Sequence, residues 1–319
     1  MTDLLPALLA AAPSAELAEQ LRQKAYQARG TMAPETGRAL RRAGAAFQVW
    51  AAAQGHPTLP AATELVADYV DALAASGRKV AGIRQSVWAI GTMHRLLALP
   101  DPTREDVVRF ALKRMARQLG TRPRQAAPLG EDDVRLLLRT AGTTLLEQRD
   151  LALLLVMRDL LARRSEVVAL DLADLHFEVD GSATALIRRS KTDQAGEGAT
   201  RWLAPRTVAS LRCWLYAAGL RDGAVFRAVN KAGRPGGRLG AAEVPRLLKQ
   251  LAASAGLDPA TVSGHSPRVG MAQDLVASGA DLASVMQAGR WKSPTMPARY
   301  AERLTARRGA VARFYERQR

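Results

Sequence analysis

Residues 263–300 read SGHSPRVGMAQDLVASGADLASVMQAGRWKSPTMPARY, and this segment opens with a histidine and an arginine three residues apart. Ser266 and Pro267 predict a helix start, because a hydroxyl can N-cap the helix and a proline ring suits its first position. His265 and Arg268 therefore cluster at a helix N-terminus, where unpaired N–H groups and the helix dipole favour an anion. An imidazole and a guanidinium at the same place suit a phosphate.

A second short helix is predicted directly after the first. Gly279 ends the first helix, and Asp281 can cap a helix over Leu282 to Ala288. Gly289 is expected to close that helix, because glycine is the usual residue at a helix C-terminus. Trp291 follows the stop.

The spacing of five residue types in this segment is more informative than any one of them. H-x-x-R at 265–268 is followed by G-x-W at 289–291 and by Tyr300, nine residues after the tryptophan. Taken singly, these are ordinarily a hydrogen-bonded histidine, a core tryptophan and a packed tyrosine. Taken together, they resemble the catalytic box of the tyrosine recombinase, or integrase, family.

Composition indicates a nucleic-acid partner. The chain has 319 residues, enough for two domains with separate cores, and 48% of them are hydrophobic, as in ordinary globular proteins. A net charge of +16 drives attraction to a polyanion, and nucleic acid is the commonest one. The alternative from charge alone is a basic soluble protein from an arginine-rich proteome.

Other classes of protein are disfavoured. Cys213 is the only cysteine, so no disulfide or cysteine-rich zinc site can form within one chain, and the four histidines show no metal-ligand spacing. The N-terminus MTDLLPALLAAAP has no basic flank, so we expect neither a secretory signal nor a membrane span. We expect a cytoplasmic protein of a cell without nuclei, or one carried by a phage or plasmid.

The first half predicts a helical domain over residues 35–120, after an extension over 1–34 that is partly helical or loose. Apolar residues at helical spacing carry this prediction, with Leu40 and Phe47 on one face. The expected helices are one from Glu35, one capped by Thr63, one over Val80 to Leu97, and one opened by the capping box Thr103-x-x-Asp106. His94 is expected on a polar face.

Five basic residues are candidate DNA contacts. They are Arg84, Arg95, Lys113, Arg114 and Lys231. A solvated face is the ordinary interpretation of such charges, but in so basic a protein a phosphate-binding role is equally favoured.

Residues 121–130 read as a linker, because TRPRQAAPLG contains two prolines and no apolar period. The second half, 131–319, predicts a mixed α+β domain with one small antiparallel sheet. Its helices are expected over 131–140, 151–161, 166–170 with Ser165 as cap, 205–218 and 241–255, and its strands over 174–179, 183–189 and 199–203. KAGRPGGRLG at 231–240 is expected to be a flexible basic loop.

The family resemblance extends outward from the catalytic box and covers about residues 35–319. The run L-L-A-R-R-S-E resembles the family's first arginine motif, which assigns Arg163 with Glu166 as its acidic companion; Arg164 is the alternative. The run R-R-S-K-T at 188–192 resembles the family's hairpin lysine and assigns Lys191.

The resemblance implies a helical core-binding domain and a catalytic domain that together form a C-shaped clamp on double-stranded DNA. It implies a homotetramer acting on two DNA sites, without cofactor or metal. Tyr300 would be the nucleophile, and Lys191 the general acid for the leaving 5′ oxygen. Arg163, Arg268, His265 and Trp291 would stabilise the phosphorane-like charge, and Glu166 would orient an arginine or the histidine.

Two features depart from the family's pattern or leave a choice open. Pro294 and Pro297 precede the tyrosine, so we expect its helix to start near Pro297, with Tyr300 in the first turn. Tyr315 is a spare phenol in the tail, 306–319, although the spacing favours Tyr300. That tail is either packed on its own domain or handed to a neighbouring protomer.

Two alternative functions fit parts of the pattern. A type IB topoisomerase uses the same kind of nucleophile as a monomer. A DNA-binding protein without catalysis would use the helix pair at 267–288 as a helix-turn-helix.

Overall fold

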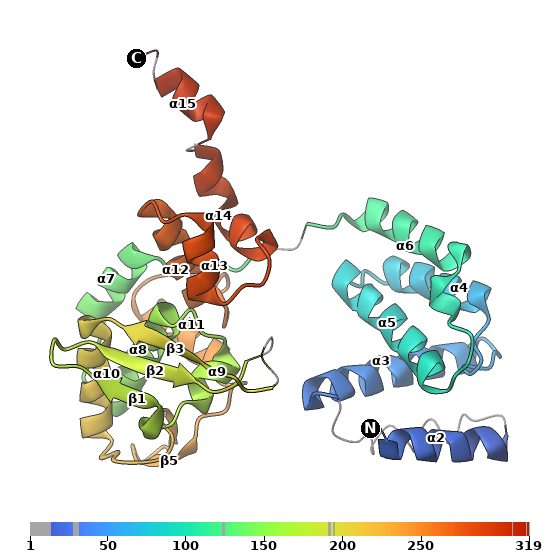
Figure 1. Cartoon of the computed structure of the whole chain (residues 1–319), viewed down its shortest axis with the longest axis horizontal. Coiled ribbons are helices and arrows are strands. Elements are labelled where there is room, and N and C mark those ends of the chain that lie inside the picture. Colours follow the sequence, from blue (N-terminus) through green and yellow to red (C-terminus); the bar gives the residue numbers. More distant parts are fainter. Residues whose placement is uncertain are drawn as a thin grey trace. The chain divides into compact units, whose positions relative to one another are not determined.

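The computed structural model describes residues 14–27, 32–122, 125–190, 193, 195–307, 309–316 and 318. The chain divides into two compact units, Met1–Pro123 and Arg124–Arg319, each with its own hydrophobic core. The division falls inside the stretch 121–130. The predicted fold class, mainly helical with a small antiparallel sheet, is confirmed (Figure 1).

Unit 1 has helices and no strand among its described residues. Its apolar stripes turn inward as their spacing predicts, so Leu40 and Phe47 are buried, and the Phe47 ring packs against Tyr69 with centroids 5.1 Å apart. The elements are α2 (Ala15–Gln27), α3 (Pro34–Ala53), α4 (Thr63–Ala75), α5 (Val80–Leu96), the 3-10 turn η1 (Pro102–Arg104) and α6 (Asp106–Leu119).

Two expectations in unit 1 are wrong. Thr103 does not cap α6: the Asp101 carboxylate accepts the Thr103 backbone N–H at 3.0 Å and its hydroxyl at 2.6 Å, and this pulls Thr103 into the 3-10 turn. His94 is fully buried, because its Nε2 accepts the Ala61 N–H at 2.9 Å and its Nδ1 donates to the Ile90 carbonyl at 2.8 Å. Both ring nitrogens are satisfied, so burial costs this neutral histidine little.

Unit 2 is built around α8 (Leu145–Asp159), whose residues from Arg149 to Arg158 are all buried. It packs against α10 (Pro205–Ala217), α11 (Val244–Ser254) and α12 (Ser266–Ala277). Helix α7 (Glu131–Thr140) begins where the sequence predicts. The remaining helices are α9 (Arg164–Ala169), the turn η2 (Leu172–Asp174), α13 (Leu282–Gly289), α14 (Thr295–Arg307) and α15 (Ala310–Glu316).

A three-stranded antiparallel sheet lies against this core. Its order is β1 (Leu175–Phe177), β2 (Ala183–Ile187), β3 (Ala199–Leu203), with Ala185 opposite both Leu175 and Arg201. The stretch expected as a flexible basic loop instead contains a strand. β5 (Pro235–Arg238) pairs antiparallel with β4 (Arg227–Val229), because the Asn230 amide oxygen accepts backbone N–H groups of the turn between them.

Three expected caps lie inside their helices instead. Thr63 and Ser266 are first residues and Ser165 is a second residue, preceded by Ala62, His265 and Arg163 as N-caps. At α12 the Ser266 hydroxyl accepts the Ser263 N–H at 2.9 Å, which ties the incoming loop to the helix start.

Candidate active site

A buried carboxylate joins two arginines from distant parts of unit 2. Arg163 is the N-cap of α9, and the Glu166 side chain accepts both its backbone N–H, at 2.9 Å, and its Nη1, at 2.6 Å. The second oxygen of Glu166 also accepts Nη2 of Arg290 at 2.6 Å. Arg164, the alternative to Arg163, is exposed on the first turn of α9. The structure therefore brings Arg163 to the carboxylate.

Arg268 lies beside this cluster at the start of α12 and is only 2% exposed. Its Nη1 donates to the Leu161 carbonyl and its Nη2 to the Gly289 carbonyl, at 2.5 Å for the latter. Burial, and then the neighbouring charge of Arg163, lower the pKa of Arg268 to about 10. The guanidinium therefore stays charged at neutral pH, held by backbone carbonyls.

Trp291 covers the Arg268 guanidinium. The Arg268 Cζ lies 4.2 Å from the centroid of the indole ring, a cation–π arrangement. The turn before the tryptophan differs from the expected one: Gly289 is the last residue of α13, and Arg290 takes the left-handed conformation, with φ 56°. A Cβ on residue 289 would clash with the Trp291 ring, so glycine is needed there for space and not for its φ.

Tyr300 stands against the other side of this group. Its ring meets that of Trp291 edge-on, with centroids 5.9 Å apart and planes at 70°, and its backbone carbonyl accepts the side-chain amide of Gln273 at 2.9 Å. The expected helix start is wrong. Helix α14 begins at Thr295, so Pro297 is its third residue and Tyr300 lies in the second turn. A proline is tolerated there because first-turn N–H groups have no intrahelical acceptor.

His265 is placed at the N-cap of α12, three residues before Arg268, and its side chain is exposed. Its backbone N–H donates to the Ser263 hydroxyl at 3.1 Å. Lys191 lies outside the described residues, so its place in the site stays a prediction. Asp193 nearby accepts the backbone N–H groups of Gly196 and Gly198, each at 2.9 Å, which closes the β2–β3 connection.

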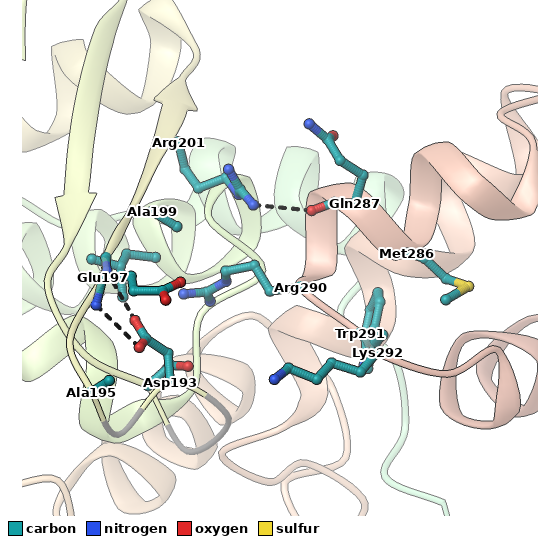
Figure 2. Close-up of a pocket in the computed structure, with 13 residues that line it drawn as sticks. Asp193, Ala195, Glu197, Ala199, Arg201, Met286, Gln287, Arg290, Trp291 and Lys292 are labelled. Carbon is teal, nitrogen blue, oxygen red and sulfur yellow. Dashed lines mark hydrogen bonds between the residues drawn. The ribbon is translucent and has the colours of Figure 1, made fainter.

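A pocket of about 510 Å³ opens between the β2–β3 connection and the end of α13. Figure 2 shows Arg290 and Lys292, in the segment that follows α13, reaching toward the connection that carries Asp193. Arg201 of β3 also lines this pocket, and its Nη2 donates to the Gln287 carbonyl at 3.1 Å. Burial and then the charge of Arg290 lower the pKa of Arg201.

The sequence did not single out Arg290 or Arg201. Both are ordinary surface charges by pattern, and the partner of Arg290 lies more than a hundred residues upstream. The one available signal is the position of Arg290 between the glycine and the tryptophan of the motif. As arranged, the cluster has more positive than negative charge, a hydrogen-bond-donating lining and an adjacent phenol, so it suits a phosphate next to a nucleophile.

The five candidate DNA contacts are exposed. Arg95 forms an ion pair with Asp101, and Arg114 forms one with Asp71. The Lys113 ammonium lies 5.9 Å from the centroid of the Phe110 ring. In the part of the chain that the structure describes, no helix is long and apolar enough to cross a membrane.

The comparisons with known proteins agree on one family. The model of the phage integrase family matches residues 128–307, more than half of the chain. The chain is 26% identical to the recombinase cre of Escherichia phage P1, over 98% of this chain and 96% of that protein. It is 29% identical to an integrase/recombinase xerD homolog of Selenomonas ruminantium, over 80% of this chain and 78% of that one.

Solved structures share the fold at low identity. The Tn1549 transposon integrase, in complex with transposon right end DNA, matches with a TM-score of 0.62 and 15% identity, over 91% of this chain and 99% of that one. The XerH site-specific recombinase bound to a palindromic difH substrate matches with a TM-score of 0.56 and 17% identity, over 75% and 66% of the two chains.

Proposed function

The chain belongs to the phage integrase family of tyrosine recombinases, and from that premise we propose that it recombines DNA at specific sites, with Tyr300 forming a covalent bond to a 3′ phosphate. The observation that carries the proposal is the series of contacts from Arg268 through Trp291 to Tyr300. The indole ring contacts both the guanidinium and the phenol ring, so one phosphate can be reached by a cation and a nucleophile together.

The proposed reaction uses the hydrogen-bond donors around these three residues. The Tyr300 oxygen attacks phosphorus while the bond to the 5′ oxygen breaks, and the phenol proton leaves to solvent. Arg163, Arg268, the Trp291 indole N–H and His265 donate to the phosphate oxygens as negative charge builds there. Lys191 protonates the departing 5′ oxygen. The phosphotyrosine ester keeps the energy of the broken bond, so a second strand reseals it without ATP.

Unit 1 supplies much of the proposed grip on DNA. Its exposed basic residues Arg84, Arg95, Lys113 and Arg114 contact DNA phosphates, and Lys231 of unit 2, in the turn between β4 and β5, does the same. The net charge of +16 favours this partner over any neutral one. The alternative of a non-catalytic helix-turn-helix protein is disfavoured, because mere DNA binding would not need the cluster of Arg268, Trp291 and Tyr300.

Recombination needs more than one copy. Four protomers would act on two sites with inverted arms and pass through a four-way Holliday junction. Helix α15 is suited to link them, because Val311, Phe314 and Tyr315 are exposed apolar residues on a helix too short to be stable alone. In a closed ring each such helix can fill a groove of the next protomer.

The proposal is tested by trapping the covalent intermediate. Incubating the protein with a random plasmid library and sequencing the junctions identifies a site. A nicked duplex carrying that site then traps the adduct. We expect Tyr300→Phe to form no adduct while binding the duplex with unchanged affinity, because only the hydroxyl is lost.

Tyr315→Phe is the matched control, because it removes the other phenol near the C-terminus. We expect it to form the adduct at the wild-type rate. An adduct with Tyr300→Phe, or a linkage to a 5′ phosphate, would overturn the assignment. Relaxation of supercoiled plasmids that lack the site would favour a topoisomerase.

A further inference from the structure

Glu166 has two arginine partners that differ in their freedom to leave. The carboxylate is itself 2% exposed, while the side chain of Arg163 is 19% exposed and that of Arg290 is 10% exposed. Each guanidinium donates to Glu166 at 2.6 Å. Of the two, Arg163 has more of its side chain open to solvent, so it is the one better placed to turn toward an incoming phosphate.

A carboxylate this buried holds its charge only while a cation stays with it. Burial alone raises the pKa of Glu166, but the charge of Arg290 and the hydrogen bonds and charge of Arg163 outweigh it, and the pKa lies below its ordinary value. If Arg163 were the sole partner, moving it to a phosphate would leave a buried, unpaired charge, which is strongly unfavourable. Glu166 would then retain Arg163.

Arg290 has unused donors with which to hold the carboxylate alone. Its Nη2 is bonded to Glu166, but its Nε and Nη1 are buried and have no hydrogen-bond partner among the described residues. The oxygen that Arg163 releases can be taken up by one of these donors, giving the two-bond arrangement that arginine and carboxylate prefer.

The backbone at position 290 does not require an arginine. Its φ of 56° is left-handed, a conformation that glycine adopts freely and that other residues adopt at a cost. What the arginine adds is therefore its side chain.

We propose that Arg290 is a positioning residue that keeps Glu166 paired while Arg163 turns from the carboxylate to the DNA phosphate. Arg290 acts through Glu166 and Arg163 and does not itself contact the DNA. The inference rests on the proposed function, because it assigns Arg163 to the phosphate.

The experiment combines Arg290→Gly with Glu166→Gln. Glycine keeps the backbone conformation and removes the side chain, so Arg163 becomes the only cation on Glu166. We expect single-turnover adduct formation on the nicked duplex to slow by about tenfold to a hundredfold, with the duplex Kd unchanged. Glutamine at 166 carries no charge to retain Arg163, so the double variant should form adduct at least about fivefold faster than Arg290→Gly alone.

The rescue separates this role from two others. If Arg290 binds DNA directly, Arg290→Gly raises the duplex Kd and Glu166→Gln does not restore the rate. If Arg290 only stabilises the fold, the melting temperature falls and the adduct rate of the folded protein is unchanged. Either result overturns the inference. Lys292→Ala, which removes a neighbouring cation of the pocket other than the two arginines paired with Glu166, should show no rescue by Glu166→Gln.

Two further arms keep the outcome decisive. If Arg290→Gly melts below the assay temperature, Arg290→Gln replaces it, because glutamine removes the charge but keeps a polar side chain. The wild-type protein must form the adduct in the same assay. Its failure to do so would contradict the proposed function, whereas a normal wild-type adduct with no effect of the Arg290 variants contradicts only the role of Arg290.

Discussion

Arg268 has a buried charge, and no carboxylate among the described residues accepts a hydrogen bond from it. Its two recorded acceptors are the carbonyls of Leu161 and Gly289, and the nearby Glu166 is already shared by two other arginines. Three guanidiniums therefore surround one carboxylate. Such an excess costs stability in the free protein and is relieved when an anion binds, which is common where a site is arranged for its ligand.

The acid sensitivity of the fold should depend on Glu166. Because its folded pKa lies below the ordinary value of 4.5, its ionised form stabilises the protein above that pH. This contribution is lost as pH falls through the folded pKa, below 4.5. We expect Glu166→Gln to have a lower melting temperature than wild type at pH 7 and a smaller difference from it near pH 3.

Melting temperatures measured from pH 7 to pH 3 check this expectation. Glu178→Gln is the control, since Glu178 is an exposed carboxylate of unit 2. The plot of its melting temperature against pH should run parallel to that of the wild-type protein from pH 7 to pH 3. A Glu166→Gln curve that also stays parallel would contradict the stabilising role of the ionised carboxylate.

For single residues, the sequence predicts which residues belong to the candidate site better than it predicts what they contact. The spacing of the motif singled out Arg268, Trp291 and Tyr300, and the structure places them in contact in that order. It could not predict Arg290, because an ion pair across the fold has no local pattern. It also could not predict that Arg268 is held by two backbone carbonyls, since these depend on where α8 ends and α13 ends.

At the scale of the elements, the predicted bounds are correct where side-chain periodicity determines them. They are wrong at the turn after α13, where the Trp291 ring crowds residue 289. Helix α7 and strand β3 have the expected bounds, and the Asp281 carboxylate caps α13 by accepting the Ser284 N–H at 2.9 Å. Gly289 was expected to close the helix after Ala288. It is instead the last helical residue, where the Trp291 ring leaves no room for a Cβ, and Arg290 after it takes the left-handed conformation.

Helix α12 approaches the start of unit 2 too closely for any side chain at Gly270. A Cβ there would clash with the Leu129 carbonyl, which also accepts Nη1 of Arg158. We expect Gly270→Ala to destabilise the protein by about 1–3 kcal/mol, the usual effect of overpacking, as measured by the urea midpoint of the full chain.

Gly82→Ala is the matched control, because Gly82 is also helical but its added Cβ would make only ordinary contacts, 3.6 Å from Arg78. Alanine there should stabilise by about 0.5–1 kcal/mol. Equal effects of the two substitutions would mean that α12 can shift away from Leu129.

At the scale of the whole molecule, helix α15 exposes three large apolar side chains, those of Val311, Phe314 and Tyr315. We expect deletion of residues 309–319 to leave binding to a single half-site unchanged and to abolish both cooperativity between two half-sites and recombination. Under the proposed function these exposed residues would fill a groove on a neighbouring protomer, and the deletion removes that apolar contact.

Gel-shift titrations on one and two half-sites, together with a recombination assay, test the deletion. The triple substitution of Val311, Phe314 and Tyr315 by serine is the control that keeps the chain length. It should behave as the deletion does. Full recombination by the deleted protein would exclude exchange of this helix, and a lowered melting temperature would indicate that the helix packs on its own unit.

The two hydrophobic cores have no residue in common. The core of unit 1 lies wholly before the segment 121–130, and the core of unit 2 takes one residue of that segment, Leu129. Substitutions on the surface of unit 1 therefore need not disturb the packing that holds Arg268 against Trp291. Under the proposed function this separates the choice of DNA from the chemistry performed on it. A programme to retarget the enzyme can randomise the exposed positions of unit 1 and select for new DNA target sites. The active site in unit 2 would keep its sequence.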